Sequence, residues 1–409
     1  MKIAWLHSHF LLWTGGTKFV YEVSRRVNRQ IPLEMYVEKT SEEARRLYRA
    51  EGIPLHEINT RTSRSKLYWL FFPFFLRRNV ARLKAVMNRH PVFISTMFPM
   101  HAAAHKAGVS RYVVYLFEPF AFFYDEDMIR GFPPIKRLLL RLLALLYKPL
   151  DREAVRQAVE VITVNEGTSV WIKDIYGRDA AQSYVATDPD FFYPIPATDP
   201  VMQELRTRYR GRKIVVHSTD FTPLKRTWDT VRAVEEAARN VPNVRLLITQ
   251  SNDDKKEIER LQKYIRQNNL EDHIELLGCL KAKDLPYYYS LADVFVYSGV
   301  GSGASSASLF VLECMACGTP GIRTDFAKDE VIDGESGFLY RHDNPKVLVE
   351  RLVKLLTDDA LCGQFGQAAR KRILEQYSWD AVTQSIVECL QAVLRQGAAA
   401  KASESTPAF

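Results

Sequence analysis

Val294-Phe-Val-Tyr-Ser298 is a run of β-branched and aromatic residues, and Gly299-Val-Gly-Ser-Gly-Ala304 follows it directly. The segment from Ser305 to Cys317 is mostly apolar and ends at Gly318-Thr-Pro320. This order predicts a strand, a tight loop and a helix. Backbone amides and the positive end of a helix dipole hold anions at such a turn, so we expect a diphosphate there. Many glycine-rich turns only reverse the chain, and the loop alone is a weak signal.

The predicted helix carries one acidic residue that needs a partner. Leu309, Leu312 and Ala316 form an apolar stripe that we expect to face inward, and Glu313 lies on the same helix. A carboxylate at a buried or cleft-facing position requires a polar group to compensate its lost hydration. A pair of sugar hydroxyl groups would serve.

Length and composition indicate a soluble protein with two domains. The 409 residues exceed one ordinary core, and the composition is 47% hydrophobic and 25% charged. No apolar run reaches about eighteen residues, and the first seven residues do not form a signal peptide, so we expect a cytosolic protein. The net charge of +8 suggests an anionic partner, which can be a nucleotide, a nucleic acid or a membrane surface.

Strands alternate with helices along both halves of the chain. Buried strands are predicted at residues 2–6, 33–37, 92–97, 111–117 and 159–164, and again at 213–217, 244–249, 273–277, 293–297 and 321–324. Such alternation predicts two doubly wound parallel sheets, which bind ligands at the carboxyl ends of their strands. Prolines between residues 186 and 200 mark a connector. We therefore expect an N-terminal Rossmann-like domain at 1–190, a second Rossmann-like domain at 191–376, a C-terminal helix at 377–396 that returns to the first domain, and a disordered tail at 397–409.

Two segments of the first half combine apolar and basic residues. Tyr68–Leu76 is aromatic and precedes Arg77 and Arg78. The helix predicted at residues 133–148 gathers one apolar face, with its basic residues opposite. Such a helix can lie on an anionic bilayer, and a core-facing helix with a solvated back fits the same pattern; the aromatic segment favours the membrane. The apolar face comprises Ile135, Leu138, Leu139, Leu142, Leu143, Leu145 and Leu146, and the basic residues are Arg137, Arg141 and Lys148.

Lys225 follows the first strand of the second half and is a candidate for neutralising a leaving phosphate, although most such lysines are simply solvated. The aspartate pairs 125/127, 188/190 and 253/254 fit solvated turns better than a metal site, and His101 and His105 have no acid or cysteine near them in the sequence. Cys314 and Cys317 have redox spacing, but their place inside a helix favours packing. The sequence therefore predicts no metal centre.

Several motifs together resemble glycosyltransferase family 4, the retaining transferases with the two-domain GT-B architecture. The resemblance covers most of the chain. Its specific parts are the signature Leu309-Phe-Val-Leu-Glu-Cys-Met-Ala-Cys-Gly-Thr-Pro320 and the block Glu330-Val-Ile-Asp-Gly-Glu-Ser-Gly-Phe-Leu339. Weaker parts are Gly15-Gly16, Asn165-Glu-Gly-Thr168, Asp188-Pro-Asp-Phe-Phe-Tyr-Pro194 and Pro223-Leu-Lys-Arg226.

The resemblance assigns roles residue by residue. Gly15 and Gly16 would let the backbone approach the donor diphosphate, and Lys225 would hold the same group from the second domain. Glu313 matches the second glutamate of the family's Glu-x7-Glu pair and is expected at the nucleotide ribose. The amides around Ser308 and Leu309 would meet phosphate oxygens. The family uses no metal and no cofactor beyond its nucleotide-sugar substrate.

Three positions depart from the family pattern. Ser305 stands where the first glutamate of the pair is expected, Asp220 where an arginine precedes the lysine, and Phe117 where a histidine follows a strand of the first half. Each change removes a group expected at the transferred sugar or its phosphates. Glu118 is then the nearby candidate for activating the acceptor, and a solvated turn glutamate explains it equally well.

These observations predict a metal-independent hexosyl- or related glycosyltransferase with two Rossmann-like domains facing across a cleft. Its acceptor would be lipid-linked or part of a cell-envelope glycan. We expect the protein to lie in the cytoplasm. Its basic surface suggests that it also contacts the inner face of the cell membrane. The alternative is a degenerate GT-B protein that binds a nucleotide sugar or a partner transferase as a scaffold. A nucleic-acid partner is not expected, because the arginines cluster with leucines and phenylalanines.

Overall fold

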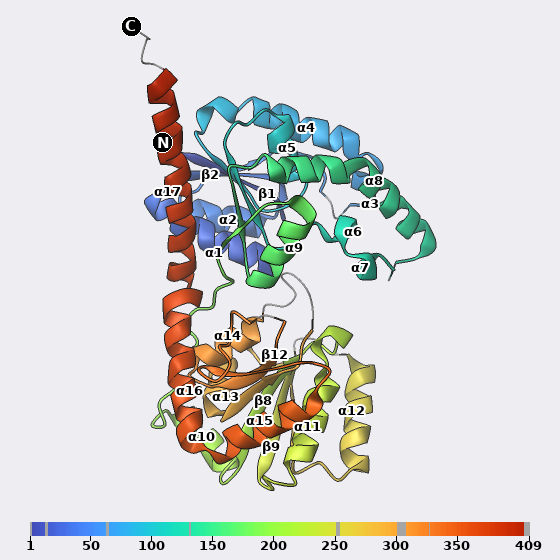
Figure 1. The fold of residues 1–409 in the computed structure, drawn as a ribbon, viewed down its shortest axis with the longest axis vertical. Coiled ribbons are helices and arrows are strands. Elements are labelled where there is room, and N and C mark those ends of the chain that lie inside the picture. The colour runs from blue at the N-terminus through green and yellow to red at the C-terminus, as the bar shows by residue number, and fades with distance from the viewer. Residues whose placement is uncertain are drawn as a thin grey trace. The chain divides into compact units, whose positions relative to one another are not determined.

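The computed structural model describes residues 2–12, 15–62, 65–130, 132–250, 254–300, 308–326 and 328–404. The chain forms two compact units, drawn in Figure 1. The first unit holds the residues up to Tyr184 together with those from Trp379 onward, and the second unit is Val185–Ser378. The last helix of the chain therefore belongs to the first unit.

The first unit is built on a parallel sheet of seven strands in the order β3-β2-β1-β4-β5-β6-β7. Residues Ile3–Leu6 of the central strand are fully buried, as expected for a strand covered on both faces. The strand order reverses between β1 and β4, which is where such sheets open a crevice for ligands. The strands are β1 (Ile3–Phe10), β2 (Leu33–Thr40), β3 (Leu55–Glu57), β4 (Phe93–Ser95), β5 (Tyr112–Leu116), β6 (Glu160–Thr163) and β7 (Ala181–Gln182).

The second unit repeats this arrangement with a parallel sheet of six strands in the order β10-β9-β8-β11-β12-β13. Its reversal lies between β8 and β11, so the loops after these two strands flank the position where a ligand is expected. The strands are β8 (Lys213–Thr219), β9 (Val244–Gln250), β10 (Ile274–Gly278), β11 (Val294–Tyr297), β12 (Gly321–Thr324) and β13 (Gly337–Tyr340).

Helices connect the strands in both units. Those of the first unit are α1 (Gly15–Gln30), α2 (Glu42–Ala50), α3 (Lys66–Leu70), α4 (Phe72–Lys84), α5 (Met100–Lys106), α6 (Ala121–Tyr124), α7 (Glu126–Arg130), α8 (Pro134–Arg156), α9 (Glu166–Tyr176) and α17 (Trp379–Glu404). Those of the second unit are α10 (Pro200–Arg208), α11 (Thr227–Ala237), α12 (Lys255–Gln267), α13 (Leu285–Leu291), α14 (Leu309–Ala316), α15 (Pro345–Thr357) and α16 (Asp359–Arg372). Short turns of tighter or wider helix lie at Met87–Arg89, Pro223–Lys225, Ala282–Asp284 and Ile373–Tyr377.

The prediction of two Rossmann-like α/β domains is confirmed by these sheets. Sequence patterns missed the three short strands β3, β7 and β13. β3 and β7 have exposed or half-buried residues and β13 begins with Gly337, so none presents the buried β-branched run that marks a central strand. Residues 397–404, expected in a disordered tail, continue α17 as a helix, and their alanine content favours that state.

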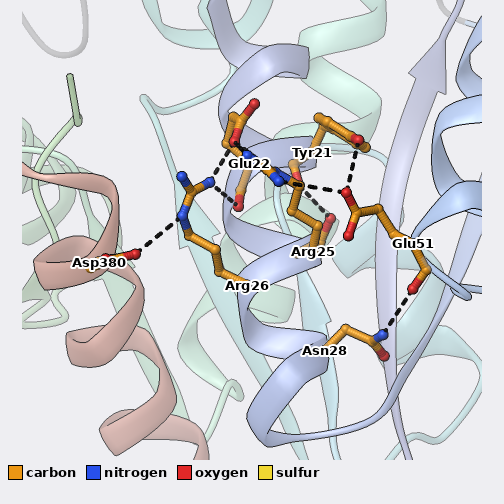
Figure 2. Close-up of polar contacts among 8 residues, drawn as sticks. Tyr21, Glu22, Arg25, Arg26, Asn28, Glu51 and Asp380 are labelled. Carbon is orange, nitrogen blue, oxygen red and sulfur yellow. Dashed lines mark hydrogen bonds and ion pairs between the residues drawn. The ribbon is translucent and has the colours of Figure 1, made fainter. Parts of the chain in front are cut away.

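The helix α17 packs against α1 inside the first unit. Arg26 on α1 donates to Asp380 across 3.3 Å (Figure 2). The Arg26 guanidinium also lies 5.6 Å from the ring centre of Trp379. The Phe19 and Trp379 rings are 5.8 Å apart. The C-terminal helix thus supplies part of the cover of α1.

A buried polar cluster joins four helices of the first unit. Asp151 on α8 is fully buried and accepts from His101 at 2.7 Å, from Tyr124 at 2.8 Å and from Tyr176 at 2.9 Å. His101 has no acid near it in the sequence, and tertiary packing supplies one. Its partner lies fifty residues away in sequence, beyond the reach of any local spacing rule.

Candidate functional site

Two loops of the second unit meet beside the reversal of its strand order. Lys225 ends the short helical turn that follows β8, and the backbone amide of Val300, in the loop after β11, donates to the carbonyl of Leu224 at 2.8 Å. Gly299 in the same loop accepts from the Thr324 hydroxyl at the end of β12. The predicted cation and the start of the glycine loop therefore lie at one edge of one sheet.

Tyr297 links Lys225 to the interior of the second unit. It is the last residue of β11 and is 2% exposed. Lys225 Nζ donates to its hydroxyl at 3.3 Å and lies 5.1 Å from its ring centre. The guanidinium carbon of Arg323 lies 5.4 Å from the same ring centre. Lys225 and Arg323 therefore both lie near the ring of Tyr297. The face of an aromatic ring attracts positive charge.

Arg323 connects this ring to the start of α14. Its side chain is fully buried in β12 and forms an ion pair with Glu330, which is 2% exposed. The other carboxylate oxygen of Glu330 accepts from the Ser308 amide at 2.9 Å. Burial lowers the pKa of Arg323 to about 10, so the guanidinium remains charged at neutral pH. Contacts therefore run without interruption from Lys225 to the N-cap residue of α14.

The structure changes what is expected of α14. The Ser308 amide, predicted at a phosphate oxygen, donates to Glu330 here. Leu312 and Ala316 are buried as expected, but Leu309 is 44% exposed, because Phe310 takes the buried position in the first turn. Glu313 is half-buried, and its negative charge adds to burial in raising the pKa of Tyr289. Ser305 and the rest of residues 301–307 lie outside the described part of the chain.

Asp220, at the position expected for an arginine, shapes the loop that carries Lys225. Its carboxylate accepts from the Thr222 amide at 2.9 Å and from the Thr222 hydroxyl at 2.6 Å. Such a contact to the residue two positions on fixes a turn. Asp220 is therefore a structural residue in the loop, and the missing arginine has no replacement at this position.

Gly15 and Gly16 open α1 after the first strand of the first unit. A side-chain carbon at Gly16 would meet no atom within 4 Å, so packing inside the unit does not require a glycine there. Phe117, at the position expected for a histidine, contacts Phe19 of α1 with ring centres 5.2 Å apart. An aromatic contact between the residue after β5 and α1 thus occupies that position.

Glu118 follows Phe117 and is exposed. The pKa of its carboxyl is nevertheless raised, first because surrounding protein atoms reduce its hydration and second because Asp125 lies near it. A raised pKa suits a group that exchanges protons near neutrality. Its proposed role at an acceptor remains a prediction.

The basic residues predicted at a membrane lie on α4 and α8, and the apolar face of α8 points outward. Arg77 and Arg141 are exposed, whereas Arg78, Arg137 and Lys148 are half-buried. The core-facing alternative was wrong for six of the seven apolar residues, and Leu143 alone of the seven is buried. The exposed fractions are 86% for Ile135, 62% for Leu138, 39% for Leu139, 51% for Leu142, 74% for Leu145 and 67% for Leu146.

The described residues include neither a membrane-spanning helix nor a metal site. No helix there combines the length and the apolar character needed to cross a bilayer. No group of three or more His, Cys, Asp or Glu side chains could hold a metal ion there. Cys314 and Cys317 are buried, and burial raises the pKa of both thiols, which makes them poor nucleophiles.

Sequence patterns missed Tyr297, Arg323 and the bond that Glu330 makes to α14. One signal was available, because Arg323 is a charged residue inside a predicted buried strand and such a charge requires a partner. Glu330 lay in the quoted family block, but nothing local linked it to Arg323 or Ser308.

Residues 203–372 match the family model described as Glycosyl transferases group 1. The GDP-mannose-dependent alpha-(1-6)-phosphatidylinositol monomannoside mannosyltransferase of Mycolicibacterium smegmatis is 27% identical over 243 residues, which cover 56% of this chain and 63% of that protein. The O-antigen chain mannosyltransferase B of Escherichia coli is 22% identical over 321 residues, which cover 75% of this chain and 81% of that protein. For the first curated relatives the match spans 63% and 50% of their own length.

Solved structures share the fold over nearly the whole chain. A glycosyltransferase from Rickettsia africae superposes with a TM-score of 0.75 at 14% identity, covering 96% of this chain and 98% of its own. HepE of Anabaena in complex with UDP superposes with a TM-score of 0.70 at 15% identity. This match covers 96% of this chain and 100% of the HepE chain. The chain therefore has the GT-B fold, and its residues 203–372 are similar to the glycosyl transferases of group 1.

Proposed function

We propose that this chain transfers a sugar from a nucleotide-diphosphate-sugar donor to a lipid-linked or cell-envelope glycan acceptor, with retention of configuration at the sugar. Relatives named as mannosyltransferases of a phosphatidylinositol monomannoside and of an O-antigen chain support this acceptor class. HepE, which shares the fold, was solved with UDP, and this supports a nucleotide at the donor site.

The observation that carries the proposal is the continuous set of contacts from Lys225 through Tyr297, Arg323 and Glu330 to Ser308. It lies beside the strand reversal of the second unit, where doubly wound sheets bind their ligands. A scaffold without catalysis has no comparable observation in its favour.

In this proposal Lys225 does the main electrostatic work. As the bond between the sugar and the diphosphate breaks, negative charge grows on the leaving diphosphate, and the ammonium group stabilises it. Tyr297 holds the ammonium in place, because its hydroxyl accepts one of three possible hydrogen bonds. The positive end of α14 adds to this field, and Glu313 would bind the ribose. A lysine and a helix end can supply the charge that a metal would otherwise supply.

The first unit would supply the acceptor and the approach to the diphosphate. Gly15 and Gly16 would let the backbone at the start of α1 come close to the donor. Glu118, whose pKa is raised by reduced hydration, would exchange a proton with an acceptor hydroxyl. Contact with an anionic membrane would run through α4 and α8, where basic and exposed apolar residues occur together.

A donor panel tests the proposal. The protein is incubated with UDP- and GDP-linked sugars and a lipid extract, and the released nucleoside diphosphate is measured. We expect turnover with one donor, no change on adding a chelator, and a loss of about 100-fold or more in Lys225→Ala. The control is Lys281→Ala, at an exposed lysine of the second unit. Folded protein that releases no nucleotide from any donor, or a Lys225→Ala variant with unchanged turnover, would contradict the proposal.

A further inference from the structure

A cavity of about 470 Å³ lies in the first unit between α4, α5 and α8. Figure 1 shows these three helices side by side, and α5 contacts both of the others. One face of α4 supplies most of the wall, Lys106 comes from the end of α5, and Tyr147 comes from α8. A cavity of this size suits a small organic ligand or a lipid headgroup. The α4 residues in the wall are Pro73, Leu76, Arg77, Val80, Ala81 and Lys84.

Three cations surround the cavity without a partner from the chain. Arg77, Lys84 and Lys106 are exposed, and their side chains form no ion pair or hydrogen bond with any residue that the structure describes. The sequence explains why, because residues 58–117 contain no aspartate and no glutamate. The same segment holds the basic residues Arg61, Arg64, Lys66, Arg77, Arg78, Arg82, Lys84, Arg89, Lys106 and Arg111. An anion from outside the chain is therefore the complementary ligand.

The rest of the wall is apolar, and exposed apolar residues lie close in the chain to two of the wall residues. Leu76 and Val80 lie between the basic residues, and the ring of Tyr147 packs on Phe72 with centres 4.5 Å apart. Next to Tyr147 in the chain are Leu145 and Leu146, which are 74% and 67% exposed. Next to Pro73 is Phe74, which is 59% exposed. A free phosphate needs none of this apolar surface, whereas a phospholipid in a bilayer presents acyl chains beside its phosphate.

We propose that this cavity binds the phosphate headgroup of an anionic phospholipid while the exposed leucines of α8 and Phe74 lie in the bilayer interface. Arg77, Lys84 and Lys106 would surround the phosphate, and Tyr147 would border the glycerol. The proposal deepens the membrane contact of the proposed function and does not depend on the donor chemistry of the second unit.

The test compares short-chain lipids below their micelle concentration with soluble anions. Dihexanoyl phosphatidylglycerol is expected to bind saturably in calorimetry, and dihexanoyl phosphatidylcholine at least about tenfold more weakly, because each basic residue favours the anionic headgroup. The double variant Arg77→Glu/Lys84→Glu should lose at least about tenfold in affinity. The matched control Arg82→Glu reverses an exposed charge on the same helix outside the cavity wall and should keep most of the affinity. Circular dichroism checks that the variants fold.

Two results would overturn the proposal. Equal losses in Arg77→Glu/Lys84→Glu and Arg82→Glu would show diffuse attraction by surface charge rather than a site. Inorganic phosphate or glycerol phosphate that binds as tightly as the short-chain lipid would show a site for free phosphate groups. Sedimentation with vesicles containing about 30% phosphatidylglycerol then checks that binding extends to a bilayer. All these measurements omit nucleotide sugar, so their failure leaves the donor chemistry standing, and failure of nucleotide release leaves the lipid result unchanged.

Discussion

A few charged side chains are buried in the otherwise apolar core of this chain, and Glu38 is one of them. Glu38 on β2 is fully buried, and one of its oxygens accepts from the Tyr68 hydroxyl at 2.6 Å and from Asn79 at 2.7 Å. Its other oxygen has no hydrogen-bond partner among the described residues. Burial raises the pKa of this carboxyl from 4.5 to about 7. The charged form is therefore costly at this position, which holds α3 and α4 against the sheet.

Glu38 should make the stability of the first unit depend on pH. Because the folded pKa is raised, the folded state binds the proton more tightly than the unfolded chain. The stabilisation from this group is complete below about pH 4.5 and is lost as the pH rises through about 7, a change of about 3 kcal/mol. We expect Glu38→Gln to remove this decrease in the free energy of unfolding, measured by urea denaturation between about pH 5 and pH 8.

Glu34 on the same strand provides the control. Its pKa is lowered, despite partial burial, by hydrogen bonds from Tyr36 and Lys2. Its contribution to the stability of the folded state is therefore lost only under more acidic conditions. Glu34→Gln should keep the decrease between about pH 5 and pH 8. A wild-type protein with equal stability across that range would contradict the assignment to Glu38.

The residues named from sequence were those whose chemistry shows in a local pattern. Lys225 follows a strand and Glu313 lies in a family signature, so both could be placed before any coordinates. Tyr297 and the ion pair of Arg323 with Glu330 depend on contacts between β11, β12 and the loop after β12. Such contacts are set by tertiary packing, and a single sequence does not encode them in any fixed spacing.

At the scale of elements, α8 shows why the direction of a helix face is hard to predict. The sequence predicted one apolar face, and the structure has two, with Leu140, Leu143 and Ala144 buried and the other leucines of the predicted face outside. Periodicity finds an apolar stripe but cannot say which of two stripes meets the core. The burial of Asp151, two residues past Pro149, adds to the difficulty, because its partners come from α5, α6 and α9.

Two neighbouring leucines of α8 should respond differently to the same change. Leu143 is 7% exposed, so Leu143→Ala leaves a cavity and should lower the free energy of unfolding by about 2–4 kcal/mol. Leu142 is 51% exposed, and Leu142→Ala should change the free energy of unfolding by less than about 1 kcal/mol. Urea denaturation of both variants measures this difference. Equal destabilisation would mean that the outer face of α8 is covered in solution.

At the scale of the whole molecule, the chain builds one unit from two distant segments. The first unit is left at Tyr184 and joined again at Trp379, after the complete second sheet. Each unit has a parallel sheet whose strand order reverses once, and the alternation of strands and helices predicted two doubly wound sheets. A C-terminal helix that returns to the first domain was also expected, but alternation does not specify its contacts on α1. These contacts join residues far apart in the sequence, as in the hydrogen bond from Arg26 to Asp380 with a separation of 354.

The junction between α17 and α1 should be held by the aromatic contact rather than by the ion pair. Trp379 is 8% exposed and packs near Phe19, whereas the side chain of Asp380 is 93% exposed and its pairing with Arg26 is screened by water. We expect Trp379→Ala to lower the free energy of unfolding by about 3–5 kcal/mol and Asp380→Ala to lower it by at most about 0.5 kcal/mol. Hydrogen exchange followed by mass spectrometry locates the effect. Trp379→Ala should speed exchange in β1 and β2 of the first unit and leave β8 and β9 unchanged, since α17 belongs to the first unit and packs on α1. Faster exchange in both sheets would show that the two units unfold together.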